Sequence, residues 1–324
     1  MGRIGLALSG GGIRAAVFHM GVLKGLAELG LWEEITYLST VSGASLGIGL
    51  VLGQNGNAWP ATGKDFLYNT LPKVEEVMVH KDLQRQALRR LPWYPRYWRH
   101  RVDFLAKILE DSWGIEGTMQ DLPAFPFWEI NCTTFETGQR FRIRRDYMGD
   151  AYVGYVQNPT LPISQVMAAS AAFPIAIGPY ILKTAGLCFT PDKQGYQAVC
   201  ERTAKKYSLW DGGVYDNLGL SPLYSQGQMD KEVDFVIVSN AGKPLEYRRR
   251  WFNVSAGNIK RLLDIALHQV DARVQEVFAP LVVAGRGAYV EISEDFPTTL
   301  HAAGEYDYLR LLKDGRDALI RNMI

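Results

Sequence analysis

The sequence has few cysteines, no long apolar run and almost no excess of either charge. Its three cysteines, Cys132, Cys188 and Cys200, are scattered and lack C-x-x-C spacing, which favours reduced thiols and argues against a zinc site. No stretch is apolar and uncharged over the length that a bilayer-spanning helix needs. The 35 Lys and Arg residues balance 34 Asp and Glu residues, so we expect no nucleic-acid partner.

The first residues also lack the order of charged segment, long apolar segment and cleavage site that defines a secretory signal. Met1-Gly2-Arg3 leads at once into an apolar run at residues 4–8. With the reduced thiols, this start predicts a cytoplasmic protein. The chain does contain 47% apolar residues, which is enough for a packed core, and 32 glycines, three groups of which follow expected strands.

Strand and helix patterns alternate along the chain and predict an α/β fold. The first fifty residues form a β-α-β unit whose two loops lie at the carboxyl edge of a parallel sheet, where such sheets bind ligands. We expect strands at residues 4–8, 35–41, 207–210, 233–238 and 288–292, a hairpin at 127–143, and helices at 13–29, 161–172, 254–278 and 306–322.

A G-x-S-x-G pattern, Gly43-Ala44-Ser45-Leu46-Gly47, follows the second expected strand. This pattern places a serine on a tight strand-to-helix turn, where the flanking glycines let the hydroxyl stand clear of the backbone. A helix that begins there also directs its unpaired N–H groups towards the serine. We therefore predict that Ser45 is a nucleophile and that Gly43 and Gly47 permit the turn. The alternative is that Ser45 only caps the helix.

A second glycine turn, Ser9 to Gly12, joins the first strand to the first helix. Its N–H groups face outwards at a helix N-terminus, as an oxyanion hole requires. The competing interpretation is dinucleotide binding, because Gly10, Gly12 and Ala15 satisfy G-x-G-x-x-A. That fingerprint also needs an acidic residue at the end of the second strand, and this strand has none.

The third glycine turn, Asp211-Gly212-Gly213, offers a carboxylate as the base. His268 and His301 follow it in the order of an α/β-hydrolase, but neither lies at a strand-end glycine turn. We therefore predict that Asp211 activates Ser45 directly, within hydrogen-bond reach and with no imidazole between them. Alternatively, Asp211 only stabilises the turn, or Asp216 is the acid, although Asp216 suits a helix N-cap better.

Taken in order, Ser9–Arg14, Gly43–Gly47 and Asp211–Gly213 resemble the patatin-like phospholipase family. The Thr133–Gly138 hairpin and Ala169–Pro174 are also similar to it. The resemblance implies a three-layer α/β/α fold with a mostly parallel central sheet. It also implies a Ser–Asp dyad that hydrolyses acyl esters of lipids without calcium, so we expect neither a metal nor a cofactor.

Carried over to this sequence, the resemblance makes Ser45 the nucleophile and Asp211 the base. It gives Gly10, Gly11 and Gly12 as oxyanion donors, with Arg14 holding the loop and Gly43, Gly47, Gly212 and Gly213 in supporting positions. The family commonly has Gly where this chain has Ala15, which bears on substrate preference. The implied function is a phospholipase A-type acyl hydrolase acting on phospholipids. The alternatives are an acyltransferase or carboxylesterase on the same dyad, or a non-catalytic lipid-binding module.

We expect one catalytic domain over residues 1–324, with a helical cap insertion at 57–126 and a C-terminal helical region at 245–324 that packs on it. The cap contains an aromatic and basic stretch at residues 85–101. Trp and Tyr favour the lipid headgroup region and Arg attracts anionic lipid, so this stretch predicts peripheral contact with an anionic membrane. The alternative is a solvated basic loop. The contact residues would be Arg89, Arg90, Trp93, Tyr94, Tyr97 and Trp98.

Overall fold

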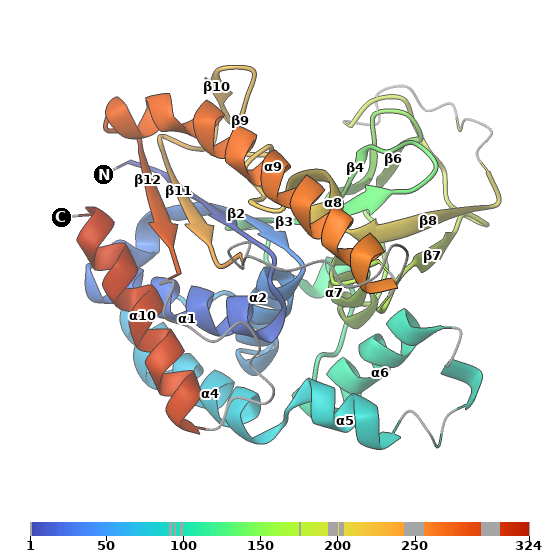
Figure 1. Cartoon of the computed structure of the whole chain (residues 1–324), viewed down its shortest axis with the longest axis horizontal. Coiled ribbons are helices and arrows are strands. Elements are labelled where there is room, and N and C mark those ends of the chain that lie inside the picture. The colour runs from blue at the N-terminus through green and yellow to red at the C-terminus, as the bar shows by residue number, and fades with distance from the viewer. Residues whose placement is uncertain are drawn as a thin grey trace.

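A ten-stranded mixed sheet forms the middle of the molecule (Figure 1). The computed structural model describes residues 2–90, 93, 95–97, 100–174, 176–193, 200, 204–242, 256–292 and 305–323. The core of the sheet is parallel and runs in the order β12-β11-β1-β2-β3. Its strands are β1 (Ile4–Leu8), β2 (Ile35–Val41), β3 (Phe127–Thr134), β11 (Phe235–Asn240) and β12 (Gly287–Glu291). The prediction of an α/β fold is confirmed.

Helices cover both faces of the parallel core because its strands bury both faces. Leu6 and Leu8 of β1 pack into the larger apolar core, with the helix that follows β1. Ala7 points the other way and joins a second core that contains Phe278 and Leu281. The two faces carry α1 (Gly12–Glu28), α2 (Gly43–Gln54) and α10 (Glu305–Met323) on one side, and α9 (Ala256–Val283) on the other.

The contact of α1 with α10 is close because glycines lie at its centre. A Cβ on Gly21 would lie 2.0 Å from the carbonyl oxygen of Leu312, and one on Gly315 would lie 2.1 Å from that of Phe18. The remaining helices and helical turns are η1 (Trp32–Glu34), α3 (Gly63–Asp65), η2 (Phe66–Thr70), α4 (Leu71–His80), α5 (Leu83–Arg90), η4 (Pro95–Tyr97), α6 (Arg101–Trp113), η5 (Met119–Asp121), α7 (Ile163–Ser170) and α8 (Gly213–Asp216).

Beyond β3 the sheet becomes antiparallel, which refines the expectation of a mostly parallel sheet. One extension continues from β3 through three short strands, and another adds two strands on the opposite side of β3. The expected hairpin at residues 127–143 is the β3–β4 pair. These strands are β4 (Arg140–Ile143), β5 (Tyr147–Asp150), β6 (Gly154–Gln157), β7 (Tyr180–Lys183) and β8 (Lys206–Asp211), and a separate pair is β9 (Tyr224–Ser225) and β10 (Gln228–Met229).

Strands β2 and β8 meet end to end along one side of β3. Val41, the last residue of β2, lies opposite Asn131, and Asp211, the last residue of β8, lies opposite Cys132. The two strands run in opposite directions, because β2 is parallel to β3 and β8 is antiparallel to it. Both chains must therefore leave the sheet at the same point, and their turns face each other.

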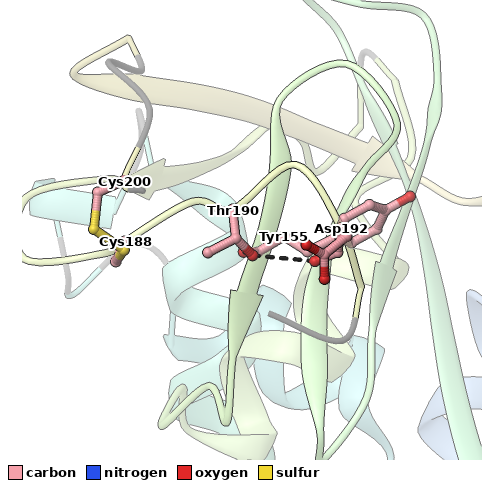
Figure 2. Close-up of a disulfide and its surroundings, with 5 residues drawn as sticks. All are labelled: Tyr155, Cys188, Thr190, Asp192 and Cys200. Atoms are coloured by element: carbon pink, nitrogen blue, oxygen red, sulfur yellow. Dashed lines mark hydrogen bonds between the residues drawn. A yellow bond between two sulfur atoms is a disulfide. The ribbon is translucent and has the colours of Figure 1, made fainter. Parts of the chain in front are cut away.

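Cys188 and Cys200 form a disulfide with a Cα–Cα distance of 5.0 Å, so the expectation of three reduced thiols was wrong (Figure 2). The pair became close because β7 and β8 are antiparallel neighbours and the two cysteines lie in the segment that joins them. Thr190, inside this segment, pairs with Tyr155 through two backbone hydrogen bonds of 2.8 Å. Disulfides persist in oxidising environments, so the cysteines no longer support a cytoplasmic location.

Removing this disulfide should destabilise the fold. We expect Cys188→Ser with Cys200→Ser to lower the free energy of unfolding by about 2–3 kcal/mol, because the crosslink restricts the unfolded chain. Urea denaturation measures the loss, and reductant should reproduce it in the wild type without affecting the double variant. Equal urea midpoints for oxidised and reduced wild-type protein would contradict the expectation.

Candidate active site

Ser42 occupies the turn between β2 and α2. Its backbone has φ 52° and ψ −117°, a conformation that non-glycine residues rarely adopt. The nucleophile elbow of α/β hydrolases has a similarly strained residue directly after a strand, and it presents a side chain above the sheet edge. The side chain of Ser42 is largely buried but lines a cavity.

Asp211 ends β8 directly opposite this elbow. Its carboxylate accepts a hydrogen bond from the Gly213 N–H at 2.8 Å. Burial raises the pKa of Asp211 to about 6, although the Gly213 N–H and the nearby Ser42 hydroxyl oppose the rise. Asp211 therefore combines proximity to a serine hydroxyl with a proton affinity higher than that of an ordinary aspartate.

Ser45, the serine expected to face Asp211, lies in the first turn of α2 and is not among the residues that line the cavity. Its side chain is fully buried, and its hydroxyl is 2.9 Å from both the Thr40 hydroxyl and the Ser170 hydroxyl. The hydroxyl that lies close enough to Asp211 to affect its pKa belongs to Ser42. The expectation that Ser45 contacts Asp211 was therefore wrong, and the serine near Asp211 is Ser42, three residues earlier.

The sequence contained a signal for this correction. The strand was expected to end at Val41, and it does. The turn must then begin at the next residue, Ser42, whereas Ser45 would lie inside the helix that follows. The G-x-S-x-G spacing was matched at Gly43 and Gly47, but those glycines serve packing inside α2. Gly43 lies against the glycine loop, and Gly47 lies against Ala16 of α1.

The glycine loop approaches Ser42 from the end of β1. A Cβ on Gly10 would lie 2.5 Å from Asn217 Oδ1 and 3.2 Å from the Cβ of Ser42, so a side chain at this position would be crowded. Gly10 was expected to be an oxyanion donor, but its N–H donates to the carbonyl of Asn217 at 3.1 Å. Gly11 and Gly12 have φ values of 142° and 68°, which favour glycine, and their N–H groups have no acceptor among the described residues.

The supporting residues hold these turns together through backbone contacts. The Arg14 guanidinium donates to the carbonyl of Ala241 at 2.7 Å and so ties the glycine loop to the chain that follows β11. A Cβ on Gly43 would lie 2.0 Å from the carbonyl oxygen of Gly12. One on Gly212 would lie 2.4 Å from that of Asn131, and one on Gly213 would lie 3.1 Å from the Asp211 carboxylate.

The other acid and base candidates have different partners. Asp216 accepts hydrogen bonds from the N–H groups of Gly219 and Ser221 and stabilises the turn after α8. It ends that helix, so the expected N-cap role was wrong. His268 lines the cavity from α9, but the described hydrogen bonds of Ser42 and Asp211 include no imidazole. His301 lies outside the described residues.

A cavity of about 1040 Å³ opens above Ser42 and Asp211. Its two sides differ in chemistry. The apolar side includes Leu83 and Ala87 of α5, Leu105 of α6, and Phe173 and Ile177. The other side is polar and is provided mainly by α9, which runs diagonally in front of the sheet in Figure 1, and by the ends of β11 and β12; its residues include Asn240, Arg261, Asp264, His268, Asp271, Gln275, Tyr289 and Glu291.

The aromatic and basic stretch near α5 is only partly described. Arg89 is exposed, and Arg90 forms an ion pair with Asp111 at 3.4 Å. Trp93 is 82% exposed. Tyr97 packs against Phe104 with ring centroids 5.3 Å apart. Tyr94 and Trp98 lie outside the described residues.

The described residues provide neither a cluster of metal ligands nor a membrane-spanning helix. Within those ranges, no group of three or more His, Cys, Asp or Glu side chains is arranged to hold a metal ion. Among the helices of the same ranges, none combines the length and the apolar character that crossing a membrane requires.

Comparison with known proteins finds phospholipases among the matches. A stretch of 49 residues is 47% identical to mouse (Mus musculus) cytosolic phospholipase A2 gamma, and it covers 15% of this chain and 8% of that protein. The structure resembles human GIVD cytosolic phospholipase A2 with a TM-score of 0.52 and 15% identity, covering 74% of this chain and 42% of that one. VipD from Legionella pneumophila gives a TM-score of 0.45 at 17% identity, and the match covers 99% of this chain and 66% of VipD.

The family model described as patatin-like phospholipase matches residues 6–224, which contain the glycine loop, the Ser42 elbow and the Asp211 turn. The matched region is more than half of the chain. This chain therefore belongs to the patatin-like phospholipase family.

Proposed function

We propose that the protein is a lipid acyl hydrolase of the phospholipase A type, with Ser42 as nucleophile and Asp211 as base. The observation that carries this proposal is the proximity of the Ser42 hydroxyl to the buried carboxylate of Asp211, where both residues line a cavity with one apolar side. Membership of the patatin-like phospholipase family supports the same assignment.

The reaction uses two steps. Asp211 accepts the Ser42 proton while the serine oxygen attacks the ester carbonyl, and the oxyanion is held by the N–H groups of Gly11, Gly12 and Gly43. The intermediate collapses, the proton passes from Asp211 to the departing alcohol, and an acyl-serine remains. Water then attacks this ester with Asp211 again as base, which releases the fatty acid and restores Ser42. The serine and the carboxylate supply both reactive groups, so the proposed steps need no calcium.

The two sides of the cavity suit a phospholipid. The apolar side, with Leu83, Leu105 and Phe173, provides a surface for an acyl chain, and the polar side borders the headgroup. We propose that residues 57–126 form a cap over the site, because α5 and α6 both line the cavity. The region 245–324 contributes the polar side through α9. The exposed Trp93 and Arg89 suit peripheral contact with an anionic membrane.

The direct test combines product analysis with covalent labelling. Vesicles of defined phospholipids should release free fatty acid and lysophospholipid, and a fluorophosphonate should label the peptide that contains Ser42. An added alcohol acceptor separates hydrolysis from acyl transfer by the product that forms. Labelling at another residue, or no fatty acid release from any phospholipid class, would contradict the proposal.

The pH dependence of the reaction should report the base. Asp211 must be ionised to accept the Ser42 proton, and its pKa is raised to about 6 by burial. We expect kcat/KM to rise about tenfold per pH unit below pH 6 and to level off above it. The measurement is a pH profile with a soluble p-nitrophenyl ester. A profile that is flat from pH 5 to 7 would show that Asp211 is not the base.

A control is needed because a second carboxyl group in the cavity titrates in the same range. Burial raises the pKa of Asp271 to about 6 as well, and its carboxylate accepts a hydrogen bond from the Asn217 amide at 3.1 Å. Asp271→Asn should leave the acidic limb near pH 6, whereas Asp211→Asn should abolish the activity. If the acidic limb disappears in Asp271→Asn, the group that titrates is Asp271 and not Asp211.

A further inference from the structure

The hydroxyl of Ser170, at the end of α7, connects three parts of the site. It accepts a hydrogen bond from the backbone N–H of Ser42 at 3.0 Å and donates one to the carbonyl of Asn131 at 2.8 Å. The Ser45 hydroxyl lies 2.9 Å away. Ser170 and Ser45 are fully buried, and the proposed mechanism gives neither serine a role.

The direction of each hydrogen bond follows from the acceptors. Asn131 offers a carbonyl, which only accepts, so the single hydroxyl proton of Ser170 points to it. Ser45 must then donate to Ser170, and Thr40 must donate to Ser45. Thr40 in turn accepts from the Trp128 indole at 2.9 Å. The hydrogen bonds of this network therefore all point the same way, from the Trp128 indole to the Asn131 carbonyl, which both belong to β3. The Ser42 N–H joins the network at the Ser170 hydroxyl.

The backbone carbonyl of Ser170 contacts the opposite turn. It accepts from the N–H of Gly212 at 3.4 Å, and the nearby carbonyl of Ala172 accepts from the N–H of Asp211 at 3.1 Å. The end of α7 thus binds the turn that carries Ser42 through a side chain and the turn that carries Asp211 through carbonyl groups. A strained turn such as the one at Ser42 persists only where its surroundings hold it.

We propose that Ser170 is a positioning residue that sets the geometry of Ser42 relative to Asp211; the inference rests on the proposed function. Without its hydroxyl, the buried N–H of Ser42 loses its acceptor, and the turn is free to relax from φ 52°. The distance and angle between the serine oxygen and its base then vary. Small misplacements of reacting groups lower the rate without weakening substrate binding.

The test compares Ser170→Ala with the matched control Ser45→Ala. Each removes one fully buried hydroxyl from the same network, but only Ser170 contacts Ser42. For hydrolysis of a p-nitrophenyl ester, we expect Ser170→Ala to lower kcat by about 10- to 100-fold with KM nearly unchanged. The rate of fluorophosphonate labelling at Ser42 should fall by the same factor. Ser45→Ala should keep most of its kcat, with a comparable fall in Tm.

Wild-type kcat and labelling rate in Ser170→Ala would overturn the proposal, as would an equal loss in Ser45→Ala. If Ser170→Ala fails to fold, Ser170→Cys keeps a side chain of similar shape with a weak acceptor, and a partial loss of kcat is expected there. Full kcat in Ser170→Cys would also overturn the proposal. Labelling of wild-type protein at a residue other than Ser42 would instead overturn the proposed function, and this inference with it.

Discussion

Replacing Ser42 by alanine should lower acyl-ester hydrolysis by about 10⁴-fold. The substitution removes the oxygen that forms the acyl-enzyme, and Asp211 then has no hydroxyl from which to accept a proton. Fluorophosphonate labelling should disappear at the same time. The fold should change little, because the backbone contacts of the elbow, including the bond from the Ser42 N–H to the Ser170 hydroxyl, remain. Steady-state kinetics and intact-protein mass spectrometry measure the two effects.

Ser45→Ala is the matched control for this substitution. Ser45 is three residues away, belongs to the same G-x-S-x-G pattern, and bonds to Thr40 and Ser170 rather than to Asp211. We expect it to retain both hydrolysis and labelling. The opposite result, in which Ser45→Ala is inactive and Ser42→Ala is active, would restore the assignment that the spacing alone suggested.

Glu129→Gln should lower the free energy of unfolding by about 3–5 kcal/mol. Glu129 is buried on β3, where the Tyr37 hydroxyl donates to it at 2.8 Å and Arg140 and Arg142 of β4 lie 3.8 and 4.0 Å away. Burial alone would raise the pKa of Glu129, but these arginines and Arg144 together hold it below its ordinary value. A neutral glutamine leaves largely buried guanidinium groups without their counter-charge.

The sign of the pH dependence follows from that lowered pKa. Glu129 stabilises the fold near neutral pH, and its contribution is lost as the pH falls and the carboxylate is protonated. Urea denaturation at pH 7 measures the loss. Glu232→Gln is the control, since this acid pairs with Arg3 at 3.5 Å on the surface and should change the stability by less than about 1 kcal/mol. Equal losses in the two variants would show that the buried charge is unimportant.

Local patterns were sufficient to predict most of the fold. The expected helix at residues 13–29 is α1, the described part of the one at 254–278 lies within α9, and the strand at 35–41 is β2 with the same bounds. These elements have strong apolar periodicity or continuous apolar runs, and packing reinforces those preferences. The direction of β8 could not be predicted, because a short strand pairs with a neighbour that is distant in sequence.

The candidate site was predicted in part. Asp211 and the glycine loop were found because strand-end turns have a clear local signature. The choice between Ser42 and Ser45 depended on which residue adopts a positive φ, and spacing does not reveal that. The hydrogen bond from Gly10 to Asn217 and the disulfide between Cys188 and Cys200 both join segments that only the folded chain brings together.

The end-to-end meeting of β2 and β8 on β3 also bears on which parts of the chain can vary in length. Val41 and Asp211 are both placed by neighbouring residues of one strand, Asn131 and Cys132. The connection between β3 and β8 does not set that spacing, and longer surface loops cost little free energy. Insertions into such a connection, for example the one closed by Cys188 and Cys200, can therefore add new surface without separating the two reactive groups.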